Sequence, residues 1–453
     1  MNSKIKKLKK IFNPKNIAVI GASSEIKSVG WGLMKNLLES KKKRKIFAIN
    51  PNRKQVLGIK CLPSVKSVKG PVDLALIAVP ASIVLRVTKE CCEKKVGGVV
   101  IISAGFAESG KKGKVLQNKI SEMVKKAKIP LIGPNVLGII RPSLGFNASF
   151  ASTLPPKGGV AFLSQSGALI DSVIDSAVAE NYGFSVIISY GNEADLTLSD
   201  FLEWLKYDKK TKAIAIYLEG IKQGRRFMQI AKEVLKIKPI VAIKAGKTKK
   251  GMEAVLTHTA SLAGSAEIYS AAFKQSGIIE VDTIEELFDI AKVLAWQPKC
   301  KNGIGVVSNG GGCAVLVADY CEQFRVNLPK LAPETVRKLE KSQKMHPTFS
   351  ERNPLDIIGD ALSDRYKVAV ESLLGQKNIH GLLVIQTLQV MTETEKNSKI
   401  IIEAQKKWPH KPIICSFLGG KLTQPGIELL EKNNIPNYPD LKRAARAINS
   451  LIR

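Results

Sequence analysis

The sequence has little of what secreted, metal-binding and membrane proteins depend on. Its seven cysteines include no C-x-x-C pair, and the adjacent Cys91 and Cys92 cannot form an ordinary disulfide or a metal site. No apolar run approaches the ~20 residues that span a bilayer, and residues 1–12 lack the apolar core and cleavage site of a signal peptide, so we interpret them as an amphipathic helix. We therefore expect a cytoplasmic protein with reduced cysteines, no metal in this chain and no membrane association.

Aromatic residues are also scarce, which matters because the chain is strongly basic. There are 70 Lys and Arg residues against 39 Asp and Glu, a net charge of +31, while aromatics make up only 6%. Surfaces that bind nucleic acid strands combine basic grooves with stacking aromatics, whereas the short lysine runs here, such as residues 6–10 and 247–250, have none interleaved. We therefore do not expect nucleic acid as the main partner. The charge indicates a positive field that concentrates anionic substrates, or simply a lysine-rich composition.

Length and apolar patterning predict three α/β domains. The 453 residues exceed the roughly 250 to 300 at which single cores stop growing. Continuous apolar segments, such as residues 17–20 and 74–79, alternate with amphipathic helices, a pattern typical of parallel, doubly wound sheets. We place a Rossmann-like domain at residues 1–140 and two flavodoxin-like, parallel-sheet domains at residues 150–297 and 300–453.

The second and third domains repeat each other, which indicates a duplication. Residues 159–168 match 303–312, and residues 238–241 match 411–414. Beyond the second match, 30 residues separate Lys247 from Gly277 in the first copy, whereas 13 separate Lys421 from Asn434 in the second. The additional piece contains His258. An insertion at the carboxyl ends of parallel strands, where open α/β sheets bind ligands, predicts a functional role.

The end of the first predicted strand carries a glycine turn that allows a helix N-terminus to approach a phosphate group. A nicotinamide site is poorly matched, because no G-x-G-x-x-G follows and the second strand leads into residues 50–54 (NPNRK) rather than an acidic residue for the ribose. The basic residues suit an additional phosphate, such as that of NADP or the 3'-phosphate of coenzyme A. Later strand ends complete the rim of the crevice. The candidate residues are Gly21, Ala22, Ser23, Asn50, Arg53, Lys54, Val79, Pro80, Ala104 and Gly105.

His258 lies in a run of small and hydroxylic residues, 256–264, which we expect to form a loop. An imidazole with its ordinary pKa of ~6.5 is partly neutral at physiological pH, so one nitrogen can attack phosphorus while a carboxylate holds the proton on the other. Glu219, which ends a buried strand before Gly220, is the candidate carboxylate that fixes the tautomer. The simpler alternatives are a solvated histidine and a surface glutamate.

A candidate anion site lies in the same domain. The turn Ser164-Gln165-Ser166-Gly167 follows a strand and opens a helix, so backbone N–H groups, the helix dipole and two hydroxyls converge there. The simpler alternative is a serine that only caps the helix. A nucleotide site is not predicted, because Gly246-Lys247-Thr248 lacks the first glycine of a Walker motif, whose position Val241 occupies. No ATP-binding domain with paired metal carboxylates is recognisable either.

Eight short motifs occur in order along the whole chain. They are Gly21-Ala22-Ser23, Gly133-Pro134-Asn135, Ser164-Gln165-Ser166-Gly167, Tyr217-Leu218-Glu219-Gly220, Lys244-Ala245-Gly246, His258-Thr259 with Ser261-Leu262-Ala263-Gly264, residues 281–287 (VDTIEEL) and Asn353-Pro354-Leu355-Asp356. This set resembles the alpha subunit of ADP-forming acetyl-CoA (acyl-CoA) synthetases, in the superfamily of succinyl-CoA synthetase. Such a set is far more specific than any one glycine turn.

The resemblance implies a separate task for each domain. The first would bind CoA, the second would carry a phosphohistidine at His258 oriented by Glu219, and the third would be a ligase-CoA domain. ADP or ATP with Mg²⁺ would belong to a separate beta subunit with an ATP-grasp domain, in a heterotetramer of two alpha and two beta subunits. Asn135 and the Gly191-Asn192 turn would lie at the acyl end of the site.

The implied reaction converts acyl-CoA, ADP and phosphate reversibly into a carboxylic acid, CoA and ATP. Phosphate would attack the thioester, His258 would accept the phosphoryl group from the acyl phosphate, and residues 164–167 would stabilise its charge. Val136 stands where the family usually has Cys and Ala260 where Gly is frequent, and Val136 alters which acid fits. The alternatives are a CoA-binding regulatory or scaffold protein without its own turnover, an NADP oxidoreductase and a nucleic-acid binder.

Overall fold

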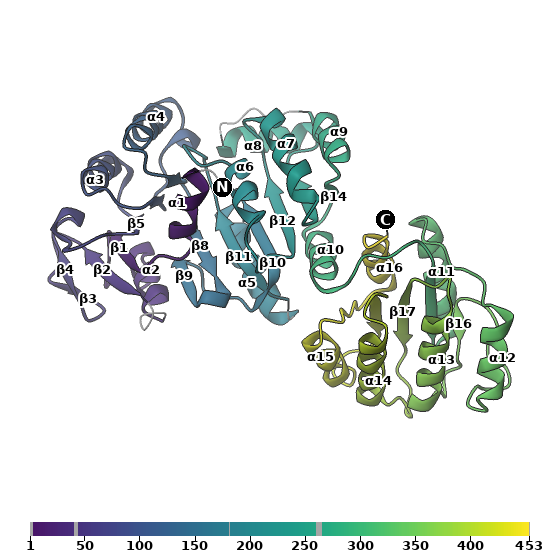
Figure 1. Cartoon of the computed structure of the whole chain (residues 1–453). Coiled ribbons are helices and arrows are strands. Elements are labelled where there is room, and N and C mark those ends of the chain that lie inside the picture. The colour runs from purple at the N-terminus through teal and green to yellow at the C-terminus, as the bar shows by residue number, and fades with distance from the viewer. Residues whose placement is uncertain (1–2, 40–43, 181, 260–264, 453) are drawn as a thin grey trace. The chain divides into compact units, whose positions relative to one another are not determined.

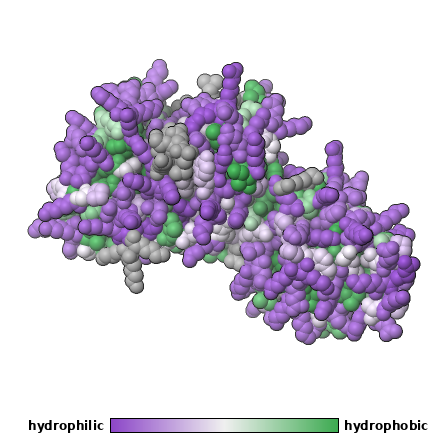
Figure 2. Space-filling view, viewed as in Figure 1, coloured by the Kyte–Doolittle hydropathy of each residue, from purple (hydrophilic) through white to green (hydrophobic). Residues whose placement is uncertain are grey.

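Helices cover largely parallel sheets in both of the units into which the chain divides, Met1–Leu287 and Phe288–Arg453 (Figure 1). The computed structural model describes residues 3–39, 44–180, 182–259 and 265–452. Within these ranges, no helix is long and apolar enough to cross a membrane. Figure 2 shows hydrophilic side chains over most of the visible face of each unit, in keeping with the dispersed lysines of the sequence.

The first sheet of unit 1 has the strand order of a Rossmann fold. It runs β3-β4-β2-β1-β5-β6-β7, which apart from the edge strand β3 corresponds to 3-2-1-4-5-6. Phe12, which follows α1, is fully buried, and its ring centroid lies 4.0 Å from that of Trp204 in α6. The elements are α1 (Ser3–Ile11), β1 (Asn16–Ile20), α2 (Val29–Leu38), β2 (Lys45–Ile49), β3 (Gln55–Val56), β4 (Ile59–Leu62), η2 (Val65–Ser67), β5 (Leu74–Ile77), α3 (Ala81–Glu93), β6 (Val99–Ile101), η3 (Ala107–Ser109), α4 (Lys111–Lys126) and β7 (Leu131–Ile132).

The second sheet of unit 1 contains the flavodoxin order. Strands β11-β10-β12-β13-β14 are parallel neighbours in the order 2-1-3-4-5, and the hairpin β8-β9, which the sequence did not predict, extends the sheet in antiparallel fashion. The elements are β8 (Gly138–Arg141), η4 (Pro142–Leu144), β9 (Phe146–Ser149), β10 (Lys157–Ser164), α5 (Gly167–Ala179), β11 (Phe184–Ser189), α6 (Leu198–Leu205), β12 (Ala213–Leu218), α7 (Gly224–Leu235), β13 (Ile240–Lys244), α8 (Lys249–Thr259), α9 (Ala266–Ser276), β14 (Ile279–Val281) and α10 (Ile284–Trp296).

Unit 2 repeats this order in the sheet β16-β15-β17-β18, with a parallel bridge between Cys415 and Asn437 at the place of a fifth strand. The repetition supports the predicted duplication. The predicted fold class, a Rossmann-like domain followed by two flavodoxin-like parallel-sheet domains, is confirmed. The elements are β15 (Ile304–Ser308), α11 (Gly311–Gln323), α12 (Pro333–Lys341), β16 (Leu355–Asp356), α13 (Ser363–Gly375), β17 (Gly381–Gln386), α14 (Thr394–Lys407), β18 (Ile413–Phe417), α15 (Gln424–Lys432) and α16 (Leu441–Asn449).

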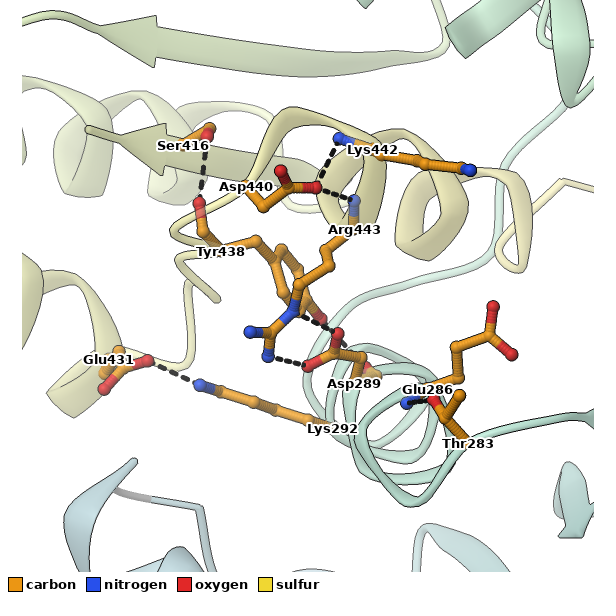
Figure 3. A network of polar contacts seen from close by, with 10 residues as sticks. All are labelled: Thr283, Glu286, Asp289, Lys292, Ser416, Glu431, Tyr438, Asp440, Lys442 and Arg443. Atoms are coloured by element: carbon orange, nitrogen blue, oxygen red, sulfur yellow. Dashed lines mark hydrogen bonds and ion pairs between the residues drawn. The ribbon is translucent and has the colours of Figure 1, made fainter.

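Two ion pairs of low exposure join α10 to the rest of unit 2 (Figure 3). The Arg443 guanidinium donates from Nε and Nη2 to the two carboxylate oxygens of Asp289, at 2.7 and 2.8 Å. Lys292 lies 2.5 Å from Glu431, and the Tyr438 hydroxyl donates to the carbonyl oxygen of Asp289 at 2.8 Å. These contacts explain why packing divides the chain inside α10, before the boundary expected at residue 297.

Candidate active site

The predicted anion site is a capped helix start at the carboxyl end of β10. The Ser166 hydroxyl accepts from the Leu169 N–H at 3.3 Å and so caps α5. Ser164 is fully buried, and its hydroxyl donates to the Ser166 carbonyl at 2.8 Å, so it shapes the turn. A capped helix start of this kind presents backbone N–H groups and the positive end of the helix dipole to a ligand. Gln165, Ser166 and Gly167 line a cavity, whereas the buried Ser164 is not among its lining residues.

Gln165 holds the loop that carries Glu219. Its Oε1 atom accepts from the backbone N–H groups of Glu219 at 2.5 Å and Gly220 at 3.1 Å, and its Nε2 atom donates to the Gly220 carbonyl at 3.2 Å. Glu219 is 6% exposed. The sequence assigned Gln165 to phosphate binding, but its side chain bonds to this neighbouring loop. It thereby fixes the backbone of Glu219, the candidate carboxylate residue, next to the residue that precedes the cap of α5.

Lys244 is a residue near this site to which the sequence assigned no role. It ends β13, where it pairs in register with Leu218, the residue before Glu219. Its side chain is buried, donates to the Ala245 carbonyl and lies 4.8 Å from the centroid of the Tyr269 ring. Burial lowers the pKa of Lys244, and the nearby Glu219 carboxylate acts in the opposite direction. A lysine at the end of an apolar strand was the signal that could have drawn attention to it.

His258 lies in the last turn of α8, not in a loop as the sequence predicted for residues 256–259. Its side chain and residues 260–264 lie outside the described part of the structure. Helix α8 accounts for the additional residues of the first copy, because α9 occupies the position that α15 has in unit 2. The approach of His258 to Glu219 therefore stays a prediction.

A cavity of about 1030 Å³ joins the two halves of unit 1. Its walls include residues 78–81 after β5, 102–104 after β6, 135–137 after β7 and 165–168 at the start of α5. The order of the first sheet reverses between β1 and β5, so the cavity lies at its topological switch point. The crevice of the Rossmann sheet and the anion-binding turn of the flavodoxin sheet thus open into one space.

Gly21 permits the close packing at this switch point. It has a φ of +92°, and a Cβ atom there would lie 2.2 Å from the Ala78 carbonyl oxygen. Helix α2 begins only at Val29, capped by Ser28, but a Cβ on Gly30 would lie 2.1 Å from the Gly21 carbonyl oxygen. The helix start therefore packs directly on the predicted glycine turn, although seven residues intervene in sequence.

The other predicted crevice residues divide into three groups. Val79, Pro80 and Ala104 line the cavity, with Gly105 next to them. Ala22, Ser23 and Asn50 shape the turn, since the Asn50 amide donates to the Ala22 carbonyl at 2.8 Å and the Ser23 hydroxyl accepts from Glu25 N–H at 3.0 Å. Arg53 and Lys54 follow β2, and both are exposed, so a charged group in the solvent can reach them.

The residues predicted for the acyl end do come together. The Asn192 N–H donates to the Pro134 carbonyl at 3.0 Å, and a Cβ on Gly191 would lie 2.3 Å from the Asn135 carbonyl oxygen. Asn135 lines the cavity. The Asn192 amide instead donates to Glu108 at 2.5 Å, a contact that the sequence did not predict. In the described part of the chain, no group of three or more His, Cys, Asp or Glu side chains is placed to hold a metal ion.

Comparisons with known proteins agree with this geometry. Residues 15–142 match the family model of a CoA binding domain, and residues 157–294 match that of the succinyl-CoA ligase like flavodoxin domain. Subunit alpha of acetate–CoA ligase (ADP-forming) II from Pyrococcus furiosus is 41% identical over 98% of this chain and 96% of its own length. The chain belongs to the alpha-subunit family of ADP-forming acetate–CoA ligases. The family that the sequence motifs resembled is thereby confirmed.

Other members of the family differ in length. Acetate–CoA ligase (ADP-forming) I of Archaeoglobus fulgidus is 41% identical over 98% of this chain, which spans 63% of that relative's length. The solved structure of dinucleotide forming acetyl-coenzyme A synthetase 1 from Ca. Korarchaeum cryptofilum, in complex with phosphate and ADP, is similar with a TM-score of 0.93 and 36% identity, covering 98% of this chain and 96% of that one. The fold of this solved structure therefore extends along 98% of the chain.

Proposed function

We propose that the chain is the alpha subunit of an ADP-forming acyl-CoA (acetate–CoA) ligase. The reaction is acyl-CoA + ADP + phosphate = carboxylic acid + CoA + ATP, through an acyl phosphate and a phosphohistidine at His258. The observation that carries the proposal is the single cavity shared by the switch point of the CoA-binding fold and the capped start of α5. A switch-point crevice or a capped helix start alone occurs in many folds. Opening into one cavity, the two features suit transfer of an acyl group from a CoA thioester to phosphate.

The first step takes place in this cavity. Phosphate lies at the start of α5, where backbone N–H groups and the helix dipole favour an anion. One phosphate oxygen attacks the thioester carbonyl carbon, the C–S bond breaks, and CoA leaves as a thiolate that takes up the phosphate proton. The product is an acyl phosphate. Asn135 and the adjacent Gly191-Asn192 turn are the residues that we assign to the acyl end.

The second step moves the phosphoryl group to the protein. One nitrogen of His258 attacks phosphorus, the bond to the acyl oxygen breaks, and the carboxylate leaves. Glu219, held in place by Gln165, keeps the proton on the other ring nitrogen and stabilises the positive ring that forms. The start of α5 stabilises the charge on the transferring group.

In the third step the phosphoryl group passes from His258 to ADP. We propose that a partner subunit holds this nucleotide. Relatives covered almost completely by this chain are named as alpha subunits, and this chain matches 63% of the length of two longer relatives. Both observations support a separate beta subunit. We propose that this subunit carries an ATP-grasp domain that holds ADP or ATP with Mg²⁺, and that two alpha and two beta subunits form the complex. A cytoplasmic location for this complex stays a prediction.

The test is turnover by the complex purified with its beta subunit. With a panel of acyl-CoA thioesters, we expect phosphate- and ADP-dependent release of CoA by the wild-type protein. The His258→Ala variant should fall to background, and Glu219→Gln should lose about 10- to 100-fold because the ring loses its orienting charge. The exposed His410 offers a matched control, since His410→Ala should behave as wild type.

Labelling with radioactive phosphate separates the ligase from a CoA-binding scaffold. Acyl-CoA plus labelled phosphate should give an acid-labile label that His258→Ala lacks. Tight CoA binding without label or turnover would favour the scaffold alternative. Turnover that survives in His258→Ala would contradict the phosphohistidine mechanism.

A further inference from the structure

Glu108 is an acidic residue beside the cavity that the proposed mechanism does not use. It lies in η3, directly after the loop that follows β6. Its Oε1 atom accepts from the backbone N–H groups of Gly105 at 2.6 Å and Phe106 at 3.1 Å. Its Oε2 atom accepts from the Asn192 amide at 2.5 Å. One carboxylate thus binds three N–H donors from two segments 84 residues apart in sequence.

Gln117 completes this group, which we name the Glu108 cluster: Glu108, Gln117 and Asn192. The Gln117 Oε1 atom accepts from the Asn192 amide at 3.0 Å and from the Ala107 N–H at 3.2 Å. Gln117, a residue of α4, is 6% exposed, so its side chain is buried and its amide is held in place by these bonds. The Asn192 amide therefore meets acceptors from both η3 and α4, and its orientation is determined by the first half of unit 1.

The Glu108 cluster connects two walls of the cavity. On one wall, the Ser103 hydroxyl donates to the Val79 carbonyl at 2.5 Å, which ties the loop after β6 to the strand end after β5. On the other wall, the Asn135 N–H donates to the Ser103 carbonyl and the Asn192 N–H to the Pro134 carbonyl, both at 3.0 Å. Glu108 joins the loop of the first wall to the turn of the second. Its loss would leave Gln117 as the remaining side-chain link of the cluster between these segments.

We infer that Glu108 is a positioning residue that sets the width of the acyl-CoA cavity and aims the Gly191-Asn192 turn at the acyl end. The inference rests on the proposed function. A carboxylate suits this place because both of its oxygens are acceptors, and the three donors converge on it from different directions. A glutamine of the same size offers one acceptor oxygen, so its NH₂ group would face either Asn192 or the N–H groups of the loop.

The geometry predicts a specific rescue. In Glu108→Gln, the amide oxygen can still accept from the loop, but the NH₂ group then opposes the NH₂ group of Asn192. Adding Asn192→Asp to Glu108→Gln replaces that second donor by acceptor oxygens and restores the hydrogen bond between these two side chains, while the bond from residue 192 to the Gln117 Oε1 atom is lost. Asn192→Asp alone instead places two carboxylates against each other. The double variant should therefore be more active than Asn192→Asp alone, which a merely destabilising change at Glu108 would not produce.

The experiment compares steady-state kinetics of these variants in the complex with the beta subunit. Glu108→Gln should raise the KM for the acyl-CoA thioester about tenfold, with a smaller change in kcat and an unchanged melting temperature. Phosphorylation of His258 from labelled ATP does not involve the thioester and should proceed as in wild type. The control is Glu122→Gln, an exposed residue of α4, which should match wild type in every assay.

The outcomes separate this inference from the proposed function. If the wild-type complex neither turns over acyl-CoA nor labels His258, the proposed function fails. If the wild type is active and Glu108→Gln has the same KM, the inference about Glu108 alone is overturned. It is also overturned if Glu108→Gln loses ATP-dependent labelling to the same extent as turnover, or if adding Glu108→Gln does not raise the activity of Asn192→Asp. A raised KM with intact labelling and partial rescue supports it.

Discussion

The ion pair between Asp289 and Arg443 gives a direct test of how α10 is anchored in unit 2. The Asp289 side chain is 9% exposed and that of Arg443 is 19% exposed, and they form a bidentate ion pair at 2.7 and 2.8 Å. Asp289→Asn keeps the shape of the side chain but removes the negative charge that Asp289 places against the Arg443 guanidinium. Removing one partner of a buried pair costs about 3–5 kcal/mol. We expect about 3 kcal/mol, the lower end, because Arg443 retains some contact with water.

This free energy translates into a measurable shift in melting temperature. Unit 2 comprises residues 288–453, a size at which 1 kcal/mol shifts the midpoint by about 2–4 °C. Calorimetry of Asp289→Asn should therefore show the unfolding transition of unit 2 lowered by roughly 6–12 °C. The control is Glu428→Gln, which breaks the 3.7 Å pair with Lys432, 48% and 66% exposed, and should cost about 0.5 kcal/mol or less. Equal shifts in both variants would refute the reasoning that burial gives the Asp289 pair its weight.

Three further predictions concern unit 1. Gln165→Leu should slow labelling of His258 about tenfold or more while the melting temperature changes little, because the loop of Glu219 loses its side-chain bonds; unchanged labelling would contradict that role. Burial raises the pKa of Glu193 to about 7, above its ordinary value. The folded protein therefore stays protonated at Glu193 up to a higher pH than the unfolded chain, so the free energy of unfolding should fall as pH rises from about 4.5 to 7. Glu193→Gln should flatten this pH dependence of the melting temperature, and an equal slope would exclude Glu193 as its cause. Gly21→Ala should weaken CoA binding in calorimetric titration far more than Gly58→Ala, which also has positive φ but meets nothing within 4 Å; equal effects would point to φ strain alone.

The features that the sequence predicted well are those encoded locally. Apolar runs at residues 17–20 and 74–79 appear as β1 and β5, and the glycine turn at Gly21 lies at the switch point. A serine before a helix identified the cap of α5. In each case a few consecutive residues specify both the backbone conformation and its hydrogen bonds, so no knowledge of distant contacts was needed.

The features that the sequence missed depend on distant packing. The contact between Glu108 and Asn192 joins segments from two different sheets, and the hairpin β8-β9 is specified by its pairing with β11. The helical state of residues 256–259 also differed from the expected loop, because a small and hydroxylic composition is a weak signal beside the continuation of an amphipathic helix. Nothing in the sequence shows that the Gln165 amide bonds to the Glu219 loop, and the assignment of Gln165 to phosphate binding stays a prediction.

The two flavodoxin-like sheets share the hydrogen bonds that shape their loops but differ in the residues that could carry out chemistry. In unit 2, the Ser308 hydroxyl shapes the turn before α11 as Ser164 does before α5. The Asn309 amide holds the loop after β17 by accepting from the Thr387 N–H at 2.6 Å and donating to the Thr387 carbonyl at 3.0 Å. Thr387 occupies the place that Glu219 has after β12. A side-chain amide that holds the neighbouring loop is thus common to both copies, as Gln165 in the first and Asn309 in the second. The Glu219 carboxylate and the additional helix α8 with His258 occur only in the first copy. We therefore expect that Thr387→Glu would not make unit 2 accept a phosphoryl group, because that copy has no histidine-bearing insertion to orient.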